Sequence, residues 1–235
     1  MRQVGFFFFA YMGYQLARGL ADHSQAHAIA NGQRVIDLEK SLGAFFEPGL
    51  QHRLVDQHWL IDFANFMYLN SHFVVTTTFL VWLYLRRNDN FYFVRNMFMI
   101  AMAIAIVGYT AFPCAPPRMF HAEGFIDTVS AVNKNSGIEK VFVNPFAAVP
   151  SMHCGFALMV GSTGFMLTRH RAIKAFWAFY PLLVFGVVVV TANHFWFDGA
   201  MGYLTASLAA LGARQLARYR ESWTFGSSQA EPARA

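Results

Sequence analysis

Charged residues are scarce in this chain, and their scarcity excludes a soluble globular domain. Of its 235 residues, 13% are charged and 56% are hydrophobic, and 26 are phenylalanine. A soluble domain of this size carries about 25% charged residues. We therefore expect a single membrane domain over residues 1–221 and a disordered cytoplasmic tail over residues 222–235.

Basic residues form no continuous patch of the kind that binds nucleic acid. The formal charge of +5 comes from short clusters between apolar runs. Such clusters orient membrane spans and contact anionic lipid headgroups. No nucleic-acid partner is expected, and the sequence contains no internal repeat.

Six apolar runs approach the length of about 20 residues that a membrane-spanning helix needs. They predict an all-α integral membrane six-helix bundle. The first run is the weakest, and it also fits a signal peptide. The runs are Val4–Leu20, Trp59–Leu85, Phe91–Phe112, Ala148–Thr168, Ala172–Ala192 and His194–Leu216.

Three basic clusters predict the orientation of these spans. The sequences RRNDN, RHRAIK and RQLARYR lie at alternate span ends, and the positive-inside rule places them in the cytoplasm. The loop Pro113–Ala147 and the turn at Asn193 then face outward. We expect a multi-pass protein of the cytoplasmic membrane. Residues 23–47 carry apolar positions at helical spacing among charges, which predicts an amphipathic helix on the outer interface.

Two histidines are expected at the same outer depth. His153 follows Pro150 at the start of the fourth span, which runs inward, and the fifth span returns outward to end just before His194. Asp198 lies four residues beyond His194, so on a continuing helix the two side chains share one face. One imidazole can then act as a nucleophile oriented by the carboxylate, and the other as a general acid.

Phosphate binding is predicted for the same outer surface. Arg118 follows the proline-rich sequence FPCAPP, and its planar guanidinium suits phosphate oxygens. The first turns of the fourth and sixth spans are expected to offer unpaired N–H groups to an anion. The small residues Gly155 and Gly202 are expected to be helix-packing positions.

Three stretches, PPRMF, AAVPSMHCGFALMVG and NHFWFDGAMG, resemble the motif regions of the phosphatidic-acid phosphatase type 2 superfamily. Within it, the chain is most similar to the bacterial branch related to inositol phosphorylceramide synthase. VIDLEKSLGAFFEPGLQ and FLVWLYLRRNDNFYFVRN also resemble that branch. The resemblance implies a membrane enzyme that acts at the outer leaflet on a phospholipid or lipid phosphate.

The resemblance also implies a role for each candidate residue. His194 attacks phosphorus to form a phosphohistidine, and Asp198 orients it. His153 protonates the leaving alkoxide and then activates water or a lipid or alcohol acceptor. Arg118 and Ser151 bind the phosphoryl oxygens. No metal or other cofactor is implied.

Two departures from the phosphatase branch bear on the reaction. That branch has a Lys well before the Arg-Pro of its first motif and a Ser-Arg pair seven and six positions before its last His. This chain has Val187 and Val188 at the latter positions and no Lys shortly upstream of Arg118. Fewer cations disfavour simple hydrolysis of a phosphomonoester and favour phosphodiester transfer between lipids, although both reactions stay open.

Two functions of other classes are also open. A membrane metalloenzyme would use His153, His194 and Asp198 as ligands, and a lipid-phosphate binder or transporter would hold the headgroup without turnover. His23 and His27 have the spacing of metal ligands on a helix. No second His-x-x-x-His pair accompanies them, so solvated side chains are the preferred interpretation. For the only two cysteines, Cys114 and Cys154, we expect unpaired thiols rather than a disulfide.

Overall fold

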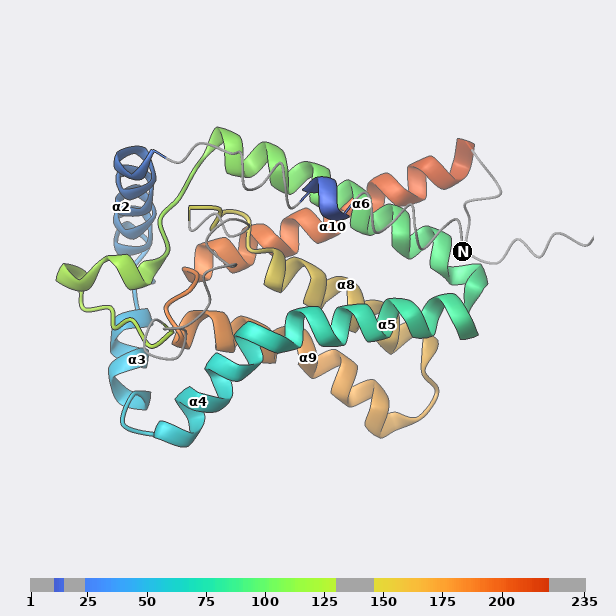
Figure 1. The fold of residues 1–235 in the computed structure, drawn as a ribbon, viewed down its shortest axis with the longest axis horizontal. Coiled ribbons are helices and arrows are strands. Elements are labelled where there is room, and N and C mark those ends of the chain that lie inside the picture. The colour runs from blue at the N-terminus through green and yellow to red at the C-terminus, as the bar shows by residue number, and fades with distance from the viewer. Residues whose placement is uncertain (1–10, 15–23, 130–145, 220–235) are drawn as a thin grey trace, which may run out of the picture.

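The computed structural model describes residues 11–14, 24–129 and 146–219, and every regular element in these ranges is a helix (Figure 1). The all-α prediction is therefore confirmed for the described part of the chain. The main helices are α2 (Gln25–Ser41), α3 (Glu47–Leu54), α4 (His58–Phe66), α5 (His72–Arg86), α6 (Asn88–Ala111), α8 (Met152–Leu167), α9 (Arg171–Val190) and α10 (Trp196–Tyr219).

Two described helices, α6 and α9, are each long and apolar enough to cross a bilayer. α4 and α5 pass the same test together, but they meet at 48° across the π-helical turn η1 (Met67–Ser71), so the predicted span Trp59–Leu85 is bent. A π-turn interrupts the regular hydrogen-bond ladder of a helix. These apolar helices indicate a membrane protein. The count of six spans stays a prediction, and most of Val4–Leu20 lies outside the described residues.

α8 is the central helix of the bundle and is shorter than predicted. It packs against α5, α6, α9 and α10, and Figure 1 shows it between them. Its 16 residues extend about 24 Å, less than the hydrocarbon core of about 30 Å. The predicted range Ala148–Thr168 began too early, because the residues before Met152 belong to the loop that enters the candidate site.

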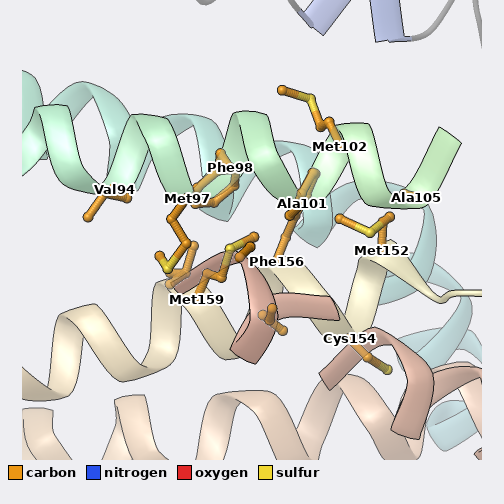
Figure 2. Packing of buried hydrophobic residues seen from close by; sticks show 14 of the residues in the cluster. Val94, Met97, Phe98, Ala101, Met102, Ala105, Met152, Cys154, Phe156 and Met159 are labelled. Carbon is orange, nitrogen blue, oxygen red and sulfur yellow. The ribbon is translucent and has the colours of Figure 1, made fainter. Parts of the chain in front are cut away.

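Large apolar side chains fill the contact between α6 and α8 (Figure 2). Met97 and Phe98 of α6 are buried in the same cluster as Phe156 and Met159 of α8, and the ring centroids of Phe98 and Phe156 are 4.7 Å apart. The surrounding acyl chains are as apolar as the side chains, so the hydrophobic effect does not drive helices together in lipid. Close packing of this kind therefore holds the helices together. The contact fixes α8 in the middle of the bundle.

Glycines set the distance between α8 and α10. A Cβ atom on Gly202 would lie 2.1 Å from the Ser151 carbonyl oxygen, and one on Gly155 would lie 3.1 Å from the Gly202 carbonyl oxygen. Backbones approach this closely only where no side chain separates them. The prediction that Gly155 and Gly202 are packing positions is confirmed.

α2 and α3 lie at one end of the bundle, and α2 runs across the direction of the long helices (Figure 1). Asn31 of α2 is buried and donates a hydrogen bond to the Pro113 carbonyl at 2.9 Å. Gly43 follows the helix with a φ of +65°, the left-handed conformation that commonly ends helices. A helix within residues 23–47 is confirmed, and its place on the membrane interface stays a prediction.

Replacing Gly202 by Ala is expected to destabilise the protein, because the new methyl group overlaps the Ser151 carbonyl. Overpacking of this kind costs about 1–3 kcal/mol. The matched control is Gly186→Ala in α9, where a Cβ atom meets nothing within 4 Å and Ala is the better helix former by about 1 kcal/mol. Thermal unfolding in detergent measures both variants, and equal midpoints would contradict the close contact.

Candidate active site

His194 lies in the turn between α9 and α10 rather than on the predicted continuous helix. α10 begins two residues later, at Trp196. The Nδ1 atom of His194 is 3.2 Å from Asp198 Oδ2, and the two residues are 6% and 0% exposed. Asp198 Oδ2 also accepts a hydrogen bond from the Phe195 N–H at 3.0 Å. The carboxylate therefore orients the imidazole through Nδ1, which leaves Nε2 as the atom that can reach a substrate.

Backbone hydrogen bonds hold the turn that carries His194. The N–H groups of Asn193 and His194 both donate to the Val188 carbonyl, at 3.1 and 3.2 Å. Ala192 adopts a φ of +52°, a left-handed conformation that costs a residue with a side chain about 1–3 kcal/mol. The surrounding hydrogen bonds stabilise this conformation, and it fixes the direction in which Asn193 and His194 leave α9.

His153 is the second residue of α8, and its ring lies next to that of His194. The two ring centroids are 5.7 Å apart. On α4–α5, Tyr68 of η1 stacks on His153 with ring centroids 4.6 Å apart. The structure thus brings together two imidazoles that are 41 positions apart in the sequence. Tyr68 restricts the orientation of one of them.

Arg118 lies in the short 3₁₀ helix η2 (Pro117–Met119) and is joined to the His194 turn. Its backbone N–H donates to the Ala192 carbonyl at 2.9 Å. Its guanidinium donates to Asn193 Oδ1. The side chain one position before His194 therefore orients the Arg118 guanidinium, whose remaining N–H groups can bind an anion.

Ser151 is the N-cap residue of α8 and contacts the backbone of Asp198. Its N–H donates to the Asp198 carbonyl at 3.0 Å. The Ser151 hydroxyl is buried beside the Cys154 thiol, a weak hydrogen-bond partner, and pairs with no oxygen or nitrogen atom of the described residues. It also makes no capping hydrogen bond to the helix. Buried hydroxyls normally have a strong partner, so this group and the first turn of α8 suit an anionic ligand.

The first turn of α10 does not offer its N–H groups to an anion, contrary to the prediction. The Trp196 N–H donates to Glu47 Oε1, and the Phe197 N–H donates to Glu39 Oε1, each at 3.2 Å. The N–H before them is already bound by Asp198. Carboxyl side chains therefore occupy the positive end of this helix. Of the two predicted helix N-termini, only that of α8 is suited to phosphate.

Sequence reasoning did not identify several groups around the site. Tyr68 lies in an apolar run, where an aromatic residue is ordinarily expected to contact lipid. Asn193 carried a usable signal, because it is a polar residue beside His194 in a predicted turn. Glu39 and Glu47 are charged positions within the predicted interfacial helix, and only the fold shows that both are buried.

No group of three or more side chains suited to a metal ion occurs among the described residues. His23 of the His-x-x-x-His pair lies outside them. Cys114 and Cys154 are buried free thiols, as predicted. Burial raises the pKa of the Cys114 thiol, and repulsion from the Asp198 and Glu39 carboxyl groups raises it further. Cys114 therefore stays protonated.

Comparison with known proteins places the chain in a family. The sequence model of the PAP2 superfamily matches residues 33–212, a range that contains Arg118, Ser151, His153, His194 and Asp198. No curated protein and no solved structure gives a significant match. Because the matched range covers well over half of the sequence, the chain belongs to the PAP2 superfamily.

Proposed function

We propose that the chain is a membrane enzyme that acts on a phospholipid or lipid phosphate through a phosphohistidine at His194. It hydrolyses the phosphate or transfers a phosphorylated head group to an alcohol acceptor. Membership of the PAP2 superfamily indicates phosphatase or phosphotransferase activity on phosphate esters. The observation that carries the proposal is the buried hydrogen bond between His194 Nδ1 and Asp198, with the imidazole of His153 next to it.

In the first half of the reaction, Nε2 of His194 attacks phosphorus. The bond from phosphorus to the leaving oxygen breaks, and that oxygen takes a proton from His153. Asp198 accepts the Nδ1–H hydrogen bond, so it selects the tautomer whose Nε2 carries the lone pair, and it stabilises the positive charge that forms on the ring. The covalent product is a phosphohistidine at His194.

In the second half, His153 acts as the base. It takes a proton from water or from an alcohol as the oxygen of that molecule attacks phosphorus and the P–N bond breaks. His194 leaves as a neutral imidazole, and Asp198 again holds Nδ1–H. The stacking of Tyr68 on His153 supports this role, because a base that acts in both halves must keep one orientation.

Three groups are suited to stabilising the phosphoryl oxygens. They are the Arg118 guanidinium, the buried Ser151 hydroxyl and the N-terminal turn of α8. The hydrogen bond from Arg118 to Asn193 fixes the guanidinium before substrate arrives. Donors that are already oriented toward developing charge are usually the largest single contribution to catalysis.

The proposal includes a six-span arrangement in the cytoplasmic membrane with the site on the extracytoplasmic face. The positive-inside rule supports this orientation. The exposed Trp59 at the start of α4 supports a position of the site at headgroup level, because tryptophan is enriched there.

Transfer of a phosphodiester is the form of the reaction that we favour, as in the synthase-like branch. Val187 and Val188, which replace the Ser-Arg pair of the phosphatase branch, are both buried. The site therefore lacks a cation at that position. A phosphomonoester dianion needs more compensating charge than a phosphodiester monoanion, so the diester suits this site better.

Replacing His194 by Ala is expected to lower turnover by at least about 10⁴-fold, because the nucleophile is removed. Purified protein with chelator present is given a mixed bacterial lipid extract plus phosphatidate. Mass spectrometry then follows free phosphate, new lipid species and a covalent phosphoryl adduct on the intact protein. The matched control is His170→Ala, an exposed histidine next to α9, which is expected to keep full turnover.

The products separate the competing functions. Free phosphate that depends on His194 indicates a phosphatase, whereas a new phosphodiester lipid without free phosphate indicates a transferase. Loss of turnover with chelator in the wild-type protein would support the metalloenzyme instead. Lipid binding without any adduct or product would support a binder or transporter, and either result would contradict the phosphohistidine.

Asp198→Asn is expected to lower kcat by about 10²–10⁴-fold with KM changed only a few-fold. The amide keeps the size of the carboxylate but stabilises neither the required tautomer nor the imidazolium. Steady-state kinetics on the substrate identified above give both constants. An unchanged kcat would remove Asp198 from the mechanism.

Arg118 and Asn193 are expected to act as a unit. Arg118→Lys keeps the charge but loses the planar fork, so KM is expected to rise by about 10-fold or more. Asn193→Ala removes the acceptor that orients Arg118, with a smaller effect of the same kind. In the double variant the effects are expected to be clearly less than additive, because the two residues contact each other. Full additivity would show that Asn193 does not work through Arg118.

A further inference from the structure

The stretch VIDLEKSLGAFFEPGLQ contains three buried polar side chains that the proposed reaction does not use. Glu39 of α2 and Glu47 and Gln51 of α3 are 0%, 1% and 0% exposed. Gln51 pairs with the Ile126 backbone: its amide N–H donates to the carbonyl at 2.8 Å, and its oxygen accepts from the N–H at 2.9 Å. Each of the two carboxyl groups accepts a hydrogen bond from α10, and Glu47 also accepts one from the Phe46 N–H at 3.0 Å.

Both carboxyl groups bind the first turn of α10. Glu39 accepts from the Phe197 N–H and Glu47 from the Trp196 N–H. The Trp196 indole N–H donates to the Ala44 carbonyl at 2.9 Å, between α2 and α3. These contacts satisfy N–H groups that would otherwise be unpaired at the helix start. They also connect the end of the molecule formed by α2 and α3 to the helix that carries Asp198.

Two buried carboxylates beside Asp198 repel one another strongly unless one of them is neutral. The pKa of Glu39 is raised to about 9, first by burial and then by hydrogen bonding with, and repulsion from, Glu47. Asp198 on α10 adds a smaller repulsion, and the Cys114 thiol is also close to Glu39. Glu39 Oε2 is buried and accepts no hydrogen bond from an N–H or O–H group of the described residues, so no donor stabilises a negative charge on that oxygen.

We propose that Glu39 and Glu47 are positioning residues: a carboxyl pair, protonated on Glu39, that fixes the first turn of α10 and so holds Asp198 and His194 in register with His153. This inference rests on the proposed function, because the pair is proposed to position the residues of that reaction. Neither glutamate touches the reacting atoms. A neutral Glu39 still accepts the Phe197 hydrogen bond and adds no negative charge beside the incoming phosphate.

The carboxyl pair is expected to limit activity at alkaline pH. Above about 9, Glu39 loses its proton, and its negative charge is then repelled by its acidic neighbours. Stability follows the same direction. The unfolded carboxyl group ionises near 4.5, whereas the folded one keeps its proton to about 9. The free energy of unfolding therefore falls as pH rises through this window.

Three substitutions at Glu39 test whether its side chain acts as a neutral hydrogen-bond acceptor or must carry a negative charge. Glu39→Gln cannot ionise but keeps the carbonyl acceptor, so it is expected to retain kcat and to lose the decline above pH 9. Glu39→Ala removes the acceptor and is expected to lower kcat by about 100-fold. Glu39→Asp keeps the acid but shortens its reach, so its kcat is expected to lie between those of the other two. Turnover is measured with phosphatidate and with the bacterial lipid extract.

Two readouts do not depend on turnover. Hydrogen exchange followed by mass spectrometry is expected to show faster exchange at the start of α10 in Glu39→Ala but not in Glu39→Gln. The thermal unfolding midpoint of Glu39→Gln is expected to rise relative to that of the wild-type protein as pH rises from about 5 to 8.5. The matched control is Asn31→Ala, a buried polar position of α2 that pairs with Pro113. Asn31→Ala is expected to lower the thermal unfolding midpoint by the same amount at every pH.

Three results would overturn the inference. One is that Glu39→Asp is active and Glu39→Gln inactive, which would assign the charge itself a role. Another is exchange at the start of α10 that no Glu39 substitution changes. The third is a midpoint difference between Glu39→Gln and the wild-type protein that is constant with pH. If the wild-type protein turns over no lipid, the proposed function fails, while exchange and unfolding still decide the carboxyl pair.

Discussion

The hydrogen bond from the Ser151 N–H to the Asp198 carbonyl joins the two helix ends on which the candidate site depends. It forms only because Gly202 has no side chain to separate α8 from α10. One backbone contact therefore determines how far His153 lies from His194. The apolar packing of α6 on α8 keeps α8 in place. The bundle core therefore also holds His153, which α8 carries.

Groups of opposite charge lie on two sides of the site. On one side, Arg118 and the start of α8 provide positive groups for a phosphate. On the other, carboxyl groups occupy the start of α10, where a phosphate would otherwise also bind. In the proposed reaction, this asymmetry favours binding of the anion beside Arg118 and the start of α8. The neutral Glu39 that we propose would add no repulsion of the substrate to that of its acidic neighbours.

The helices and the closeness of the two histidines were predictable, because apolar runs and their alternating direction fix which span ends meet. The local structure was less predictable from the sequence. The residues before α8 are as apolar as the helix, so hydropathy could not place its start at Met152. The pattern of residues 23–47 predicts an interfacial amphipathic helix and gives no sign that Glu39 and Glu47 are buried. Their burial depends on N–H groups about 150 residues away in the sequence, which no local pattern records.

The segment 130–145 is flanked by anchored residues on both sides. Before it, the Thr128 carbonyl accepts a hydrogen bond from Asn65 at 3.1 Å. After it, the Phe146 carbonyl accepts one from the Cys114 N–H at 2.8 Å. Asn65 belongs to α4 and Cys114 to the loop before η2, so two different parts of the bundle hold Thr128 and Phe146 in place.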